Sequence, residues 1–286
     1  MIYTLRGITA VLFISISTVF WCTPLYLMGF VRFLLPAKHI RTSLGDLMDR
    51  IIDGWVFSNR AMVRYLHIAT IEKPPLLAEL ERTDWNVVVC NHQSWTDILV
   101  LQNTLLGHIP PLKFFTKQEL IYVPLVGVAM WLLGFPYVRR YSREQLERDP
   151  SLRDHDRNTT LQACRGFLER PTSVLNFLEG TRYSEQKKIA QHSPYSHLLL
   201  PKTGGLGYVC EALEQRIDNI IDVTIVYPDR PPGFWEFLCG RCARIDFHAR
   251  RYPAPPADRD GRKDWADELW RGKDDEISRS LLPRSE

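Results

Sequence analysis

The sequence lacks the signatures of several common functional classes. It contains no Gly-x-Ser-x-Gly segment, the turn that exposes the nucleophilic serine of many hydrolases. It has no internal repeat, no low-complexity segment and no dense basic stripe, so nothing indicates a nucleic-acid-binding protein. Six cysteines without a regular framework fit a reduced compartment, and Cys239 and Cys242 lack the second cysteine pair that would complete a zinc site. We therefore expect no bound metal.

Charge is missing from one long segment near the N-terminus. No charged side chain occurs from Gly7 to Val31, a run long enough to cross a hydrocarbon core of about 30 Å. This run is too long for a typical signal peptide and lacks a small-residue cleavage site, so we expect residues 1–40 to form a retained membrane anchor. Pro24 near its middle permits either a kink or a re-entrant hairpin.

The flanking charges predict how this anchor is oriented. Arg6 precedes the uncharged run, and four basic residues follow it: Arg32, Lys38, Arg41 and Arg50. Under the positive-inside rule, this asymmetry places the downstream chain in the cytosol. The modest net charge of +3 suits the anionic surface of a membrane.

The rest of the chain is predicted to form one α/β domain. The 286 residues, 45% of them hydrophobic, suffice for one sizeable domain plus the anchor. We expect residues 41–84 to form a linking region with an amphipathic helix that is either interfacial or core-packing, and residues 85–286 to form the functional domain. Apolar patterns predict strands at 85–90, 172–178, 220–227 and 243–250, helices at 42–65, 94–106 and 262–282, and exposed loops at 141–158 and 184–196.

The clearest functional signal is His92 followed by Asp97. Neutral imidazole suits the removal of a proton from a hydroxyl, and a carboxylate on the far ring nitrogen fixes the tautomer and stabilises the imidazolium. His92 follows the first predicted strand, at the kind of strand end where open α/β sheets place ligand sites. Five positions on one helix would turn the pair to different faces, so their contact requires His92 to lie off the helix. A purely structural histidine in the turn is the alternative.

A second group, Glu179 to Arg182, follows the strand expected at 172–178. Arg182 offers a planar fork that suits a phosphate, Gly180 lets the backbone approach a ligand, and Thr181 can donate a hydroxyl hydrogen bond. A turn with solvated Glu and Arg side chains is the alternative. Two strand ends, each followed by polar residues, would then face one crevice.

These segments together resemble the glycerolipid acyltransferase family typified by 1-acylglycerol-3-phosphate acyltransferases. The family's first block, N-H-x-S-x-x-D, matches Asn91, His92, Ser94 and Asp97, and its third block, F-P-E-G-T-R, matches Phe177, Glu179, Gly180, Thr181 and Arg182. The second block resembles Lys117 to Gly127 with Gly134 to Arg140, and the fourth resembles Leu200 to Gly204. Within this family, the chain looks most like the probable acyltransferases of the bacterial inner membrane.

The resemblance implies an α/β fold like that of glycerol-3-phosphate acyltransferase, with a mixed sheet flanked by helices and an N-terminal membrane-embedded helical segment. In the family's roles, His92 is the base, Asp97 orients it, and Arg182 holds the acceptor phosphate together with Arg140 or its neighbour Arg139. Further candidates for substrate binding are Glu179, Gly180, Thr181 and Lys117, although Lys117 and Lys202 are equally consistent with surface lysines. The acyl donor would be acyl-CoA or acyl carrier protein, with no other cofactor, at the cytosolic face of the membrane.

One departure from the family pattern concerns the acceptor. Leu178 replaces the proline usual before Glu179, a feature closer to the subgroup that includes lysophospholipid-remodelling enzymes. The favoured acceptor is the 2-hydroxyl of lysophosphatidic acid, and another lysophospholipid, such as lysophosphatidylglycerol, is the runner-up. A hydrolase and a non-catalytic lipid-binding protein are the other classes. The apolar stretch 121–133 lines an acyl-chain tunnel or forms an ordinary buried helix.

Overall fold

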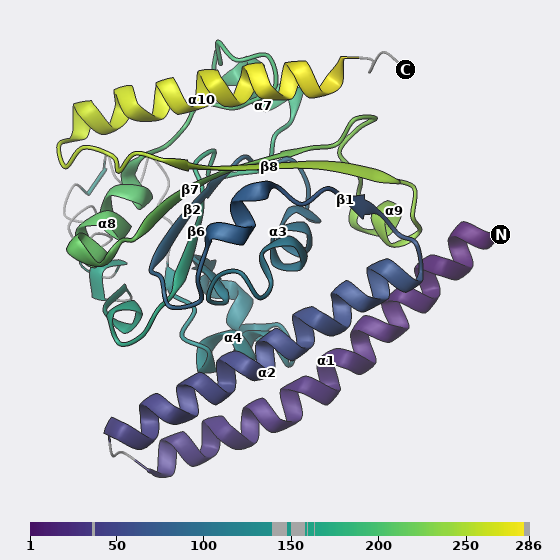
Figure 1. Ribbon diagram of the computed structural model, residues 1–286, viewed down its shortest axis with the longest axis vertical. Helices are drawn as coiled ribbons and strands as arrows, with labels where there is room; N and C mark the ends of the chain where they lie inside the picture. The colour runs from purple at the N-terminus through teal and green to yellow at the C-terminus, as the bar shows by residue number, and fades with distance from the viewer. Residues whose placement is uncertain (36–37, 139–147, 150–157, 159, 163, 283–286) are drawn as a thin grey trace.

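A six-stranded mixed sheet forms the centre of the computed structural model, which describes residues 1–35, 38–138, 148–149, 158, 160–162 and 164–282. The strand order is β1-β8-β7-β2-β6-β3 (Figure 1). These strands are β1 (Thr70–Ile71), β2 (Asn86–Cys90), β3 (Leu112–Phe114), β6 (Ser173–Phe177), β7 (Asn219–Val226) and β8 (Arg244–Tyr252). β2 is parallel to β6 and β7, whereas β7 and β8 are antiparallel. The mixed α/β sheet predicted from the sequence is confirmed.

β2 lies in the middle of the sheet and is buried along its whole length. Its side chains alternate between two cores, as the two-residue period of a strand requires. Val88 and Cys90 pack on the side of α3 (Asp97–Leu105), whereas Val87 and Val89 pack on the side of α10 (Arg259–Leu281). A continuous apolar run is therefore the correct pattern for this strand, because both of its faces are covered.

The register of the sheet brings the two polar segments together. Cys90 at the end of β2 lies opposite Phe177 at the end of β6. Because the two strands are parallel, the residues that follow both of them leave from the same edge of the sheet. Residues 91–97 and 178–182 are thereby placed side by side, at the two neighbouring strand ends that the sequence predicted.

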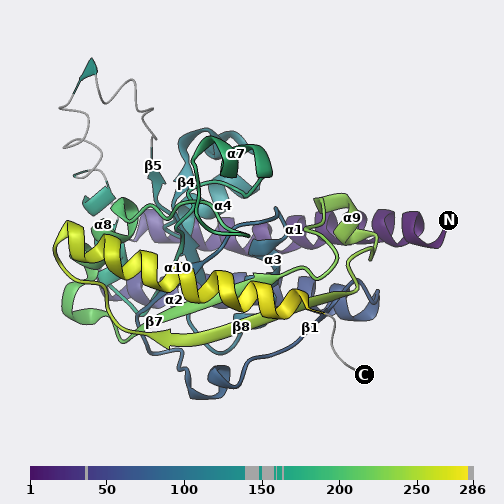
Figure 2. The same ribbon diagram turned by 90° about the horizontal axis from the view of Figure 1, so that it is seen from above.

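The N-terminal part of the chain forms a helical hairpin of α1 (Ile2–Leu34) and α2 (Lys38–Tyr65). The indole of Trp21 donates to the Ser58 hydroxyl at 3.0 Å, and the indole of Trp55 donates to Thr18 at 3.1 Å. α1 is one helix through Pro24, so the uncharged run does not reverse as a re-entrant hairpin would. Figure 1 shows this hairpin and α10 on opposite sides of the sheet, and Figure 2 shows the N-terminal end of α1 extending past the sheet.

α1 is the one helix, among the residues that the structure describes, that is long and apolar enough to cross a membrane. It nevertheless packs closely against the domain near both of its ends. A Cβ atom at Gly7 would lie 2.7 Å from Cys239, and a Cβ atom at Gly29 would lie 2.6 Å from Leu132. The glycines therefore allow α1 to approach α9 (Phe234–Leu238) and α4 (Val126–Leu132).

Shorter elements complete the described part of the chain. They are η1 (Pro75–Glu79), β4 (Thr116–Lys117), η2 (Gln118–Tyr122), β5 (Tyr137–Val138), η3 (Arg165–Leu168), α7 (Glu185–Ala190), α8 (Gly204–Leu213) and η4 (Glu214–Arg216). The polar segment 184–196, expected as a loop, contains α7, whose first turn is capped when the Ser184 hydroxyl accepts from Lys187 N. Most of the charged segment 141–158 lies outside the described residues.

The apolar stretch 121–133 differs from the ordinary buried helix that was one of its two predicted forms. α4 and the turn before it expose large side chains, including Tyr122, Val128 and Trp131. Gly127 is in close contact with the backbone of Ile121 and Leu120, so any added Cβ there would meet a carbonyl group. A bulky residue at Gly127 would consequently distort this segment whether or not it lines an acyl-chain tunnel.

Candidate active site

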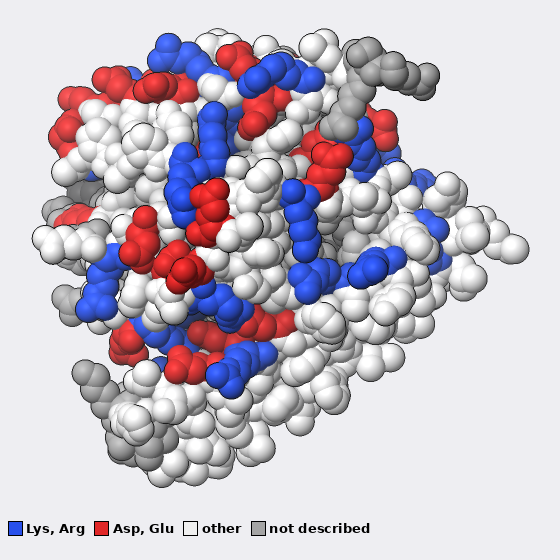
Figure 3. Space-filling view, in the orientation of Figure 1, with Lys and Arg blue, Asp and Glu red and all other residues white. Residues whose placement is uncertain are grey.

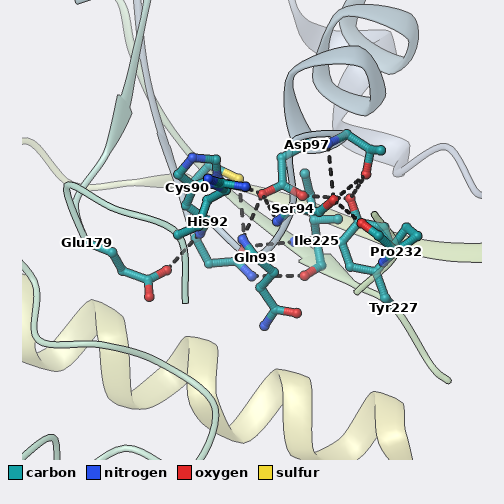
Figure 4. Close-up of polar contacts among 12 residues, drawn as sticks. Cys90, His92, Gln93, Ser94, Asp97, Glu179, Ile225, Tyr227 and Pro232 are labelled. Carbon is teal, nitrogen blue, oxygen red and sulfur yellow. Dashed lines mark hydrogen bonds and ion pairs between the residues drawn. The ribbon is translucent and has the colours of Figure 1, made fainter. Parts of the chain in front are cut away.

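His92 and Asp97 are in direct contact at the carboxyl end of β2 (Figure 4). His92 lies in the turn after the strand, and Asp97 is the first residue of α3. The helix begins three residues later than the sequence predicted, because residues up to Thr96 form the turn. His92 Nδ1 lies 2.8 Å from Asp97 Oδ2. The predicted geometry, with the histidine off the helix, is confirmed.

The Asp97 carboxylate is surrounded by hydrogen-bond donors. Oδ2 accepts from the backbone N–H groups of Gln93 at 2.7 Å and Ser94 at 2.9 Å, in addition to its contact with His92. Oδ1 accepts from the Tyr227 hydroxyl at 2.6 Å. Burial raises the pKa of Tyr227 well above its usual range, so this phenol keeps its proton and donates it. These bonds fix the orientation of the carboxylate that faces the imidazole.

Two further residues of the first block hold the turn in place. The Asn91 side chain pairs with β7, donating to Ile225 O and accepting from Ile225 N, each at 2.9 Å. The Ser94 hydroxyl donates to Pro232 O at 2.6 Å. Both side chains are buried, so the block's asparagine and serine act on the backbone of the turn and are not directed at a substrate.

The Glu179 segment brackets the backbone of His92. Glu179 Oε1 accepts from His92 N at 2.7 Å, and Tyr183 N donates to His92 O, also at 2.7 Å. Glu179 Oε2 accepts from Leu199 N at 3.0 Å, and the side chain is fully buried. Burial raises its pKa to about 7. This placement fits a residue that positions His92 better than one that contacts the substrate directly.

The His92 imidazole packs against the end of the sheet on one side and is partly exposed to solvent on the other. The ring stacks on Phe177, the last residue of β6, with 4.0 Å between ring centroids and 17° between ring planes. The His92 side chain is 16% exposed, against 1% for Asp97. Because Nδ1 faces Asp97, Nε2 is the ring nitrogen left to meet a substrate.

Arg182 lies beside this pair, on the turn after β6. Its guanidinium stacks on Trp95, with 4.1 Å from Cζ to the ring centroid. Lys187 Nζ donates to the Arg182 carbonyl at 2.8 Å and to the Thr181 hydroxyl at 2.9 Å, so a second cation supports the same turn. Gly180 has φ of +66°, which favours glycine at this position. The sequence assigned no role to Trp95 or Lys187.

A family model described as Acyltransferase matches residues 77–228, which is more than half of the chain. The chain belongs to the acyltransferase family. The matched segment contains the His92 turn and the Arg182 turn. The resemblance stated from these motifs is therefore confirmed.

Sequence relatives of this acyltransferase are lysophospholipid enzymes by name. Lysocardiolipin acyltransferase 1 from Danio rerio is 27% identical over 299 residues, which cover 98% of this chain and 73% of the relative. The 1-acyl-sn-glycerol-3-phosphate acyltransferase epsilon from Mus musculus is 27% identical over 227 residues, which cover 70% of this chain. The chain spans 59% of the length of that mouse relative.

The fold is also found in a solved structure. The 1-acyl-sn-glycerophosphate acyltransferase PlsC from Thermotoga maritima superimposes with a TM-score of 0.59 at 15% identity, covering 99% of this chain and 100% of PlsC. At this identity the likeness concerns the fold alone. It agrees with the predicted acyltransferase architecture, including helices at the N-terminus.

The remaining candidate residues are less closely tied to the His92 centre of this acyltransferase. Lys202 lies next to Gly180, with its Nζ 3.8 Å from where a Cβ would stand. Lys117 is exposed on β4, in the separate two-stranded sheet with β5, and the described residues show no contact between it and His92. Arg140 and Arg139 lie outside the described residues.

The chemistry available at this site is proton transfer by an imidazole. Among the described residues, Asp97 is the one side chain that hydrogen-bonds the His92 ring. Cys90 is buried, and burial raises the pKa of its thiol well above the usual range, so it is a poor nucleophile. The Ser94 hydroxyl is committed to Pro232 O. The arrangement suits activation of a hydroxyl that the substrate brings, whereas a hydrolase with a covalent intermediate would need a nucleophile beside the histidine.

Proposed function

We propose that this acyltransferase moves a fatty acyl group from a thioester donor, acyl-CoA or acyl carrier protein, to the 2-hydroxyl of lysophosphatidic acid, giving phosphatidic acid. The observation that carries the proposal is the contact of His92 with Asp97 beside Arg182 on the neighbouring strand end. One group can take a proton, and the other can bind a phosphate. A hydroxyl-bearing lipid phosphate is an acceptor that uses both.

The proposed reaction begins when His92 Nε2 accepts the proton of the acceptor hydroxyl. The hydroxyl oxygen attacks the thioester carbonyl carbon, and the new C–O bond forms a tetrahedral intermediate. Asp97 stabilises the imidazolium across the 2.8 Å contact with Nδ1. As the C–S bond breaks, the imidazolium returns its proton to the leaving thiolate, so that the products are an ester and a free thiol. No metal is needed for these steps.

The acceptor phosphate is assigned to Arg182, whose planar guanidinium can bind two phosphate oxygens at once. Trp95 supports the guanidinium face, and Lys187 and Lys202 add positive charge to the same turn. Arg140, Thr181 and Gly180 remain candidate contributors, with Lys117 a more distant one. Glu179 is assigned to positioning His92, because both of its oxygens accept backbone N–H groups.

A second acceptor class is favoured by one observation. The Danio rerio relative aligned over 98% of this chain is named for lysocardiolipin. An acceptor such as lysophosphatidylglycerol or a larger lysophospholipid therefore remains the alternative. Leu178 is fully buried in the core, so its difference from the family's proline does not change a direct contact with the acceptor.

We further propose that the enzyme works at the cytosolic face of a bacterial inner membrane. Support comes from the length and apolarity of α1 and from the exposed apolar side chains along it. The acyl donors are cytosolic molecules, and the acceptor lies in the membrane. A reporter fused after Glu286 that is active only outside the cytosol would refute this orientation.

The proposed activity is tested with the purified full-length protein in detergent micelles. Lysophosphatidic acid, lysophosphatidylglycerol and a monolysocardiolipin are each offered with acyl-CoA and with acyl carrier protein, and the products are identified by mass. Phosphatidic acid as the preferred product supports the main proposal. A preference for a different diacyl product selects the alternative acceptor, and release of free fatty acid alone would overturn acyl transfer.

A further inference from the structure

A second cleft lies between α2, β1 and α3, and none of the catalytic residues lines it. Its volume is about 740 Å³, and it is open to solvent. α3 lines this cleft with Asn103 and Thr104 near its C-terminal end, whereas the catalytic Asp97 is its first residue. Thr104 is seven positions after Asp97, which corresponds to about 10 Å along the helix axis. The cleft is thus a separate site.

The rim of this cleft is basic and partly aromatic. Arg60 and Arg64 on α2 and Lys73 after β1 line it, and no acidic side chain is among the described residues that do. The Arg60 guanidinium lies over the Phe57 ring, with 5.6 Å from Cζ to the centroid. Figure 3 shows basic side chains gathered around a hollow on this face, next to the uncharged surface of the N-terminal helix.

The floor of the cleft contains a polar group without a partner. Asn103 is 4% exposed, and neither its Nδ2 nor its Oδ1 makes a hydrogen bond among the described residues. Leaving a buried amide unsatisfied costs about 1–3 kcal/mol, so such a group calls for a function. An amide N–H at the floor and three cations at the rim are donors that suit an anion with several oxygen acceptors.

We propose that this cleft binds the phosphate group of an anionic phospholipid in the membrane surface. Hydrogen bonds of Trp21 with Ser58 and of Trp55 with Thr18 join the middle of α1 to α2, and the two helices run in opposite directions (Figure 1), so the C-terminal end of α2 lies beside the N-terminal half of α1. That half of α1 exposes Ile8, Leu12 and Ile16. The basic cleft therefore borders an apolar surface, as a phospholipid's phosphate borders its hydrocarbon chains. Basic side chains beside an apolar membrane-binding surface attract anionic lipids.

The test measures binding of the full-length protein to phosphatidylcholine vesicles with and without added phosphatidylglycerol. The variant Arg60→Gln/Arg64→Gln removes two charges from the cleft, and Arg271→Gln/Arg279→Gln removes two exposed charges from α10 as a matched control. We expect the cleft variant to lose about 10- to 30-fold of the affinity for vesicles that contain phosphatidylglycerol, with unchanged binding to phosphatidylcholine alone. The control should keep the wild-type preference.

A second variant separates binding from folding. Asn103→Leu removes a buried amide that has no partner, so the variant should unfold at the same or a higher temperature while its preference for phosphatidylglycerol weakens. An unaltered preference in both this variant and the arginine variant would overturn the site. A raised KM for acyl-CoA with normal vesicle binding would overturn the lipid assignment and give the cleft to the donor phosphates. The vesicle-binding measurements do not require turnover, so they test this site even if the proposed acyl transfer fails.

Discussion

The guanidinium of Arg182 lies 4.1 Å above the indole ring of Trp95. Trp95 belongs to the turn that carries His92, and Arg182 belongs to the turn after β6, so this contact joins the two segments of the active site. The indole is 59% exposed, and it fixes the Arg182 side chain without burying it. A phosphate-binding arginine held in this way is already oriented before the acceptor arrives.

Replacing Trp95 with alanine is expected to weaken acceptor binding. A cation over an indole contributes about 0.5–1 kcal/mol at an exposed site, so KM for the lysophospholipid should rise by a factor of about 2 to 5. Turnover at saturation should change less, because the His92–Asp97 contact remains. Steady-state kinetics of Trp95→Ala are compared with Trp95→Phe, which keeps an aromatic face. A fall in kcat at constant KM would contradict the proposed role.

Replacing His92 with alanine is expected to remove the base. Turnover should fall about 10²- to 10⁴-fold, the range typical of general acid–base catalysis, while the thermal unfolding midpoint stays close to that of the wild type. His39→Ala, at an exposed histidine on α2, is the matched control and should keep normal turnover. Turnover by His92→Ala near the wild-type rate would exclude His92 as the base.

The local part of this site was predictable, because its signals lie within short segments. The buried strand before His92, the turn and the helix after it follow from an apolar run and a five-residue spacing. The parallel arrangement of two such strands then implied one crevice. The largest shift in a boundary of these two elements is the start of α3, which begins at Asp97 while Ser94, whose hydroxyl binds Pro232 O, stays in the turn.

The long-range part of the site was not predictable from one sequence. Tyr227 reaches Asp97 across 130 positions, and Asn91 pairs with β7 across 134. Lys273, on a helix expected to dock through apolar residues, is fully buried and lies 2.6 Å from Asp222 of β7. Such contacts depend on the register of β7 and on the packing of α10, and no local pattern encodes either. A tyrosine or lysine in isolation is indistinguishable from many others.

The packing of α1 on the domain leads to a prediction about Gly7. A Cβ at this position would lie 2.7 Å from Cys239 Sγ and 2.9 Å from the Trp235 ring, so Gly7→Ala must push α1 away from α9. Cys239 is 1% exposed, and this shift should increase its rate of alkylation by a maleimide, followed by peptide mass mapping. Gly204→Ala, where a Cβ would meet open space, is the control. Equal labelling in both variants would show that α1 is not tightly docked.

Glu179 links the stability of the protein to pH. Burial raises its pKa from 4.5 to about 7, so the folded state favours the protonated carboxyl. Below pH 4.5 both states are protonated and ionisation has no effect on stability. As the pH rises from 4.5 to about 7, the unfolded chain ionises first, and stability falls by about 3 kcal/mol. The ionised form is nevertheless the one that accepts N–H groups from both His92 and Leu199.

Replacing Glu179 with glutamine should therefore separate stability from activity. The neutral amide cannot ionise, so the unfolding temperature of Glu179→Gln should vary less than that of the wild type between about pH 4.5 and 7. Its NH₂ group would face a backbone N–H of His92 or Leu199, and turnover should fall about 10-fold because the turn loses one anchor. Glu268→Gln, at an exposed carboxylate on α10, should keep the wild-type profile. Among the described residues, Glu179 is the one ionisable side chain that accepts from the His92 backbone. If the unfolding temperatures of the wild type and of Glu179→Gln depend on pH in the same way, another group carries the titration.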